Sequence, residues 1–134
     1  MSPQDLDIVY TVTDWYDGAR AGVAELSGKP HYYECQFDES KHDWSDVYLL
    51  KPLGEETFRL AMEDWDIWLR WEAAFHEGRT THETHPALPE DRARHDELAY
   101  ALSGRLAISP DTGIKAKGDF KYGEPTLVKW SVIP

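Results

Sequence analysis

Four histidines and one glutamate are the residues of this sequence that could do metal chemistry. His76, His82, His85 and His95 fall within a short stretch, and Glu72 lies one helical turn before His76. Residues four apart on a helix share a face, so Glu72 and His76 can reach one ion. Imidazole and carboxylate groups are zinc ligands in both structural and catalytic sites. Glu72, His76, His82 and His85 are therefore candidate ligands for zinc or a similar divalent metal in a small hydrolase-like enzyme.

Glu72 is also the candidate catalytic residue, because it shares its predicted helix face with large aromatic rings. A buried carboxylate is costly unless it is paired, and a general base tuned by desolvation has this setting. The structural alternative pairs Glu72 with His76 and leaves His82 and His85 as solvated loop residues. His82 and His85 are one residue too close for the His-Glu-x-x-His motif, which favours the structural alternative.

Aromatic rings beside acids at strand ends form a second candidate site. Trp15 and Tyr16 stand between two aspartates, and Tyr32 lies two residues before Glu34. Exposed rings and carboxylates together attract a cation and repel an anion. We therefore take Trp15, Tyr16 and Tyr32 as candidate binding residues for a cationic group, with a plain core role as the alternative.

The charge of the chain limits its partners. The sequence has 25 acidic and 14 basic residues, for a net charge of −11. Residues 105–134 hold five basic and three acidic residues, or +2, which leaves −13 on residues 1–104. Nucleic-acid binding needs a basic footprint, so this composition argues against it and favours a basic or cationic partner.

Cysteine usage and hydropathy predict a cytoplasmic protein. Cys35 is the only cysteine, so the chain has no internal disulfide, and a small buried hydrophobe is its expected role. The polar, acidic start of the sequence resembles no secretory signal. No apolar run approaches the roughly 18 residues of a membrane span, so no membrane partner is expected.

The N-terminal part of the sequence predicts four short strands separated by turns. Their ranges are 8–13, 21–26, 31–37 and 47–51, each rich in β-branched or aromatic residues. In the third strand, alternation places His31, Tyr33, Cys35 and Phe37 on one face.

The middle of the sequence predicts one long and one shorter helix. The long helix spans about residues 55–77 and ends at Gly78. It is apolar over more than half its circumference, and Trp65 and Trp68 lie on its widest apolar stripe, where we expect core positions. The shorter helix begins at Pro89 and is capped by Gly104.

The C-terminal part predicts a β-ribbon. Between Ile114 and Tyr122, apolar residues alternate with Lys115, Lys117 and Lys121, as in an antiparallel strand with one buried face. The whole chain, residues 1–134, is expected to form one α+β domain. In it, a small curved antiparallel sheet or partial SH3-like barrel, made of the N-terminal strands and this ribbon, packs against the two helices.

Three function hypotheses remain open. The leading one is a non-enzymatic binding or interaction module of a soluble, bacterial-type protein, including a homodimer that uses exposed tryptophans. The second is the metal-dependent enzyme built on Glu72 and the histidines. The third is an acidic inhibitor or immunity-type protein that neutralises a basic partner.

Overall fold

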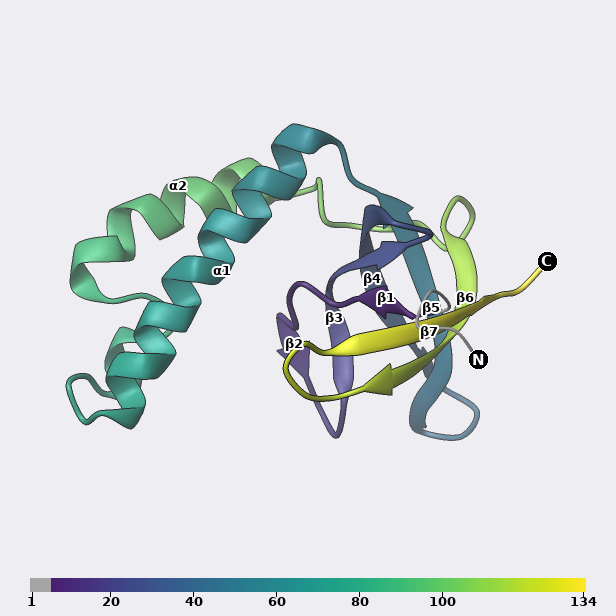
Figure 1. Ribbon diagram of the computed structural model, residues 1–134, viewed down its shortest axis with the longest axis horizontal. Coiled ribbons are helices and arrows are strands. Elements are labelled where there is room, and N and C mark those ends of the chain that lie inside the picture. The colour runs from purple at the N-terminus through teal and green to yellow at the C-terminus, as the bar shows by residue number, and fades with distance from the viewer. Residues whose placement is uncertain (1–5) are drawn as a thin grey trace. The chain divides into compact units, whose positions relative to one another are not determined.

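The computed structural model describes residues 6–134 and contains a seven-stranded antiparallel sheet and two α-helices (Figure 1). The strands are β1 (Asp7–Ile8), β2 (Asp14–Trp15), β3 (Ala19–Leu26), β4 (Lys29–Asp38), β5 (Asp43–Pro52), β6 (Ile114–Lys121) and β7 (Leu127–Val132). The α-helices are α1 (Glu55–His76) and α2 (Arg92–Leu102), with short 3-10 helices η2 (His82–Thr84) and η3 (Pro89–Asp91) between them. The α+β class and the curved antiparallel sheet are confirmed.

The chain divides into two compact units. The sheet unit runs up to Gly54 and resumes at Ile108, and the helical unit is Glu55–Ala107. The SH3-like detail and the expectation that residues 1–134 act as one domain stay predictions.

The sheet curls because one segment contributes to both of its ends. The strand order is β1-β7-β6-β5-β4-β3-β2, and β1 and β2 both belong to the segment 7–15. β1 pairs with β7, and the residues after it turn to β3: the backbone N–H groups of Tyr10 and Thr11 donate to the Val23 carbonyl, and that of Thr13 donates to Ala21. The expected strand 8–13 is wrong beyond Ile8: the structure has two short strands, at 7–8 and 14–15, because the segment between them changes partner.

Gly22 lets this segment pass close to β3. A methyl group at Gly22 would lie 2.1 Å from the carbonyl oxygen of Thr11. Thr11 is fully buried, and its hydroxyl accepts the Val23 N–H at 2.9 Å. The Tyr33 hydroxyl donates to the Thr11 carbonyl at 2.9 Å. Only a residue without a Cβ allows this close approach, which satisfies the buried polar groups of the crossing.

The core of the sheet unit lies on one face of the curled sheet. Tyr33, Tyr48 and Leu50 are buried there, with Ala116 and Val128 from the C-terminal ribbon. Phe120 and Trp130 pack around these residues, with ring centroids 5.4–6.0 Å from the two core tyrosines. The alternation expected in β6 is confirmed, since its apolar positions face this core and its lysines are exposed.

The buried face of α1 differs from the expected one. Its buried residues are Leu60, Ala61, Ile67, Trp71 and Ala74. Trp65 and Trp68 are only half-buried and stack on each other at 4.8 Å, so their assignment to the core is wrong. A helix that is apolar over most of its surface has two faces of similar hydrophobicity, and periodicity alone does not show which of them is buried.

Charged pairs join α1 to the segment that follows it. Arg70 binds Asp91 through two hydrogen bonds of 3.0 and 3.1 Å, and His95 Nδ1 lies 2.6 Å from Asp64 Oδ1. The Arg70–Asp91 pair is partly exposed and the His95–Asp64 pair is half-buried. Surface ion pairs are worth about 0–1 kcal/mol each, so apolar packing provides most of the stability of this unit. No helix in the described part of the chain is long and apolar enough to cross a membrane.

Candidate functional site

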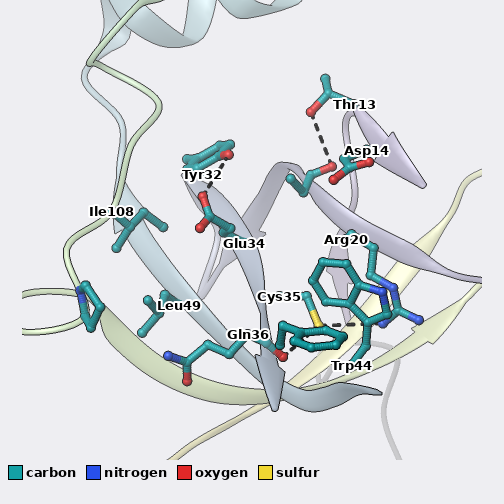
Figure 2. Close-up of a pocket in the computed structure, with 13 residues that line it drawn as sticks. Thr13, Asp14, Arg20, Tyr32, Glu34, Cys35, Gln36, Trp44, Leu49 and Ile108 are labelled. Atoms are coloured by element: carbon teal, nitrogen blue, oxygen red, sulfur yellow. Dashed lines mark hydrogen bonds between the residues drawn. The ribbon is translucent and has the colours of Figure 1, made fainter. Parts of the chain in front are cut away.

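A concave region of about 560 Å³ opens on the sheet unit (Figure 2). Strands β2 to β5 supply most of its lining, and the segment that begins at Ile108 closes one side. Its polar and aromatic side chains include Asp14, Arg20, Glu34 and Trp44. All of these residues belong to the sheet unit.

Strand alternation explains how Tyr32 and Glu34 reach the pocket. Tyr33 and Cys35 of β4 belong to the core cluster, so their neighbours Tyr32 and Glu34 point the other way. In the register of the sheet, Glu34 pairs with Ala21 on one side and with Leu49 on the other, and both partners line the pocket.

One end of the pocket is acidic. The Tyr32 hydroxyl donates to Glu34 Oε2 at 3.3 Å, and Asp14 of β2 lines the same pocket across from them (Figure 2). Burial raises the pKa of Tyr32 well above its usual range, and the charges of Glu34 and Asp14 raise it further. Its hydroxyl therefore stays protonated at neutral pH. No ion pair among residues 6–134 involves Asp14 or Glu34.

The other end of the pocket holds an arginine fixed against aromatic rings. Arg20 Nε donates to the carbonyl of Tyr16 at 2.7 Å, and Nη2 donates to that of Asp17 at 3.1 Å. The guanidinium lies 5.1 Å from the ring centroid of Trp44, which meets Phe37 edge to face at 5.3 Å. The charge of Arg20 is thus held by groups of its own chain.

Cys35 lies behind this arginine as a buried thiol. It is 5% exposed, and its Sγ is 3.6 Å from Arg20 Nη1. Burial raises the pKa of the Cys35 thiol, and Arg20 opposes this shift without reversing it. The thiol form dominates at neutral pH, in keeping with the expected role as a small hydrophobe.

The candidate binding residues separate into two groups. Tyr32 lines the pocket, and Trp15 and Tyr16 are outside its lining. Trp15 follows Asp14 directly and is 58% exposed, and Tyr16 is 67% exposed. The ring of Trp15 packs edge to face on Tyr122 at 5.1 Å. Their binding role stays a prediction.

The candidate metal ligands pack mainly against aromatic rings. His85 meets Trp71 at 4.7 Å between ring centroids, and His82 meets Phe75 at 4.6 Å. All three histidines of the candidate set are exposed, and Glu72 is half-buried. Within residues 6–134, no three His, Cys, Asp or Glu side chains form a group that could hold a metal ion. The metal site and the catalytic role of Glu72 stay predictions.

Sequence reasoning missed Arg20, Phe37 and Trp44. Pairing β4 with β5 across the charged turn at 39–42 would have placed Phe37 beside Trp44. Phe37, expected on the same face as Tyr33 and Cys35, is 43% exposed, and the register of β4 and β5 shifts between Cys35 and Phe37. No local signal places Arg20 over Trp44.

Comparison with protein-family models, curated proteins and solved structures finds no match to this chain.

Proposed function

We propose that this protein is a non-enzymatic binding module and that its pocket accepts a cationic group from a basic partner. The observation that carries the proposal is the acidic end of the pocket. There, Asp14 and Glu34 line the pocket together with Tyr32, and no cation of residues 6–134 is paired to either carboxylate. A guanidinium or ammonium group would supply the missing charge and hydrogen-bond donors.

The charge of the whole chain supports the same class of partner. At −11, the protein repels anions over its surface and attracts cations toward an acidic concavity. The inhibitor or immunity-type hypothesis uses the same attraction over a larger surface. Both describe a protein that recognises a basic partner.

The protonation states of the pocket favour binding over catalysis. The raised pKa values of Tyr32 and Cys35 keep both side chains protonated at neutral pH. Neither residue is then an activated nucleophile, which would need a lowered pKa or an adjacent base. The pocket is better suited to hold a ligand than to attack one.

Titration with N-acetyl-arginine amide, followed by NMR of the ¹⁵N-labelled protein, tests the proposal. We expect saturable shifts at the amides of Tyr32 and Glu34. Glu34→Gln should weaken binding at least about fivefold, or ~1 kcal/mol, because one charged acceptor is lost.

Glu90→Gln is the matched control. Glu90 is exposed in the helical unit, and its substitution makes the same change in net charge. An equal effect of both variants would show that only overall charge matters and would refute the pocket as the site.

A further inference from the structure

We infer that the cation belongs to an arginine-rich polypeptide segment, and that this segment extends from the pocket onto the aromatic end of the sheet unit. We define the aromatic end by four exposed rings: Trp15, Tyr16, Phe37 and Tyr122. The inference rests on the proposed function and names the partner class of that site.

The four rings gather because three turns of the sheet lie at the same end. β2 and β3 meet where Trp15 pairs with Ala19, and β4 and β5 meet where Phe37 pairs with Trp44. The turn that follows Tyr122 connects β6 to β7. The antiparallel registers bring the start of β3, the end of β4, the start of β5 and the end of β6 together.

Two of these rings, Trp15 and Tyr122, are exposed yet held in place. Trp15 is 58% exposed and Tyr122 52%, and each packs on the other at 5.1 Å. The Tyr122 hydroxyl accepts the Ala19 N–H at 2.9 Å, and its ring stacks on Phe120 at 5.9 Å. Rigid exposed aromatic rings are the residues that typically anchor an interface, because little side-chain entropy is lost on binding.

The aromatic end is continuous with the pocket. Phe37 belongs to both, and Asp14, which lines the pocket, is followed directly by Trp15. A segment held by the carboxylates of Asp14 and Glu34 can therefore extend along the pocket to the exposed rings. One extended segment can contact both, whereas a single small cation occupies the pocket alone.

Charge complementarity selects a basic occupant. The ranges 14–20, 36–46 and 119–124 form this end and contain eight acidic and three basic residues. Of the basic ones, Arg20 is fixed by its own chain, and Lys121 pairs with Asp119 at 3.2 Å. This surplus of acid opposes phosphate groups and favours a cationic polypeptide.

The chain itself shows why the basic residues should be arginines. The guanidinium of Arg20 already lies over Trp44 while its N–H groups donate to the carbonyls of Tyr16 and Asp17. A guanidinium is planar, stacks on rings and presents several fixed donors, whereas an ammonium is a compact and strongly hydrated charge. Exposed rings beside carboxylates should therefore prefer arginine to lysine.

Two peptides of equal charge test this inference with the full chain. Acetylated nona-arginine amide and nona-lysine amide are titrated calorimetrically at fixed salt. We expect the arginine peptide to bind at least about threefold more tightly, since an exposed cation–π contact is worth ~0.5–1 kcal/mol. Trp15→Ala should remove most of this preference. Tyr100→Ala, which truncates an 87% exposed ring on α2, should leave it unchanged.

The outcomes separate the two proposals. Equal affinity for both peptides, or a preference that survives in Trp15→Ala with an unchanged melting temperature, would overturn the extended arginine-rich segment and leave the pocket proposal standing. A lack of binding by either peptide would overturn both. If sedimentation shows a wild-type dimer that Trp15→Ala dissociates, the occupant is a second copy, and the inference is wrong.

Discussion

Replacing Gly22 with alanine should destabilise the protein far more than one methyl group normally does. The new Cβ would lie 2.1 Å from the Thr11 carbonyl oxygen, where ordinary contact begins at 3.4 Å. The backbone at Thr11 must therefore move away from β3 by the difference, about 1.3 Å. This movement also strains the 2.9 Å hydrogen bond that the Tyr33 hydroxyl donates to the Thr11 carbonyl. Overpacking costs typically ~1–3 kcal/mol, and an unsatisfied buried carbonyl adds ~1–3 kcal/mol. We expect a loss of about 3–5 kcal/mol, from a total stability of about 5–15 kcal/mol.

Urea unfolding followed by tryptophan fluorescence measures this loss. Gly54→Ala is the matched control, because no atom lies within 4 Å of its added Cβ and its φ is outside the left-handed region. Gly54→Ala should leave the stability unchanged or raise it by up to ~1 kcal/mol, because alanine lowers the conformational entropy of the unfolded chain. If Gly22→Ala and Gly54→Ala unfold at the same urea concentration, the close crossing of Thr11 over β3 is wrong.

Further predictions address the helical unit, the C-terminal ribbon, alkaline pH and metal. Trp71→Ala should lower the free energy of unfolding by about 3–5 kcal/mol, and Trp65→Ala should lower it by less than ~2 kcal/mol, because Trp71 is buried and Trp65 is only half-buried. Equal urea midpoints for these two variants would contradict the assigned buried face of α1. Lys117→Glu should change stability by no more than ~0.5 kcal/mol, and a loss of several kcal/mol would place this exposed side chain under cover. A hydrogen bond to Glu25 raises the pKa of Tyr10 from 10.0 to about 12. The stabilisation that this hydrogen bond gives is therefore complete below about pH 10 and is lost as the pH rises through 12. The urea midpoint of the wild-type protein should therefore fall between pH 10 and 12, and that of Tyr10→Phe should fall less. If the midpoints of the two proteins fall equally over this pH range, Tyr10 does not have this role. We expect the melting temperature to be unchanged by a chelator or by zinc, and an increase on adding zinc would instead establish a metal site.

The sequence by itself determined the local elements and the charge. Alternation from Ile114 to Tyr122 predicted which side of β6 is exposed, because a strand with one solvent-exposed face has only one arrangement that buries its apolar residues. Acids at Glu55 and Glu56 and the glycine at Gly78 predicted the limits of α1 to within a residue. The proposal of a cationic partner likewise follows from composition and from acids beside rings.

Tertiary structure decided which residues meet. The buried stripe of α1 passes through Ile67 and Trp71, and a helix with apolar residues on most of its surface leaves that choice to its neighbours. The pairing of β4 with β5 sets Phe37 against Trp44. Arg20 reaches Trp44 only because β3, β4 and β5 lie side by side. Contacts between distant segments depend on strand order and register, and the local pattern of a sequence specifies neither.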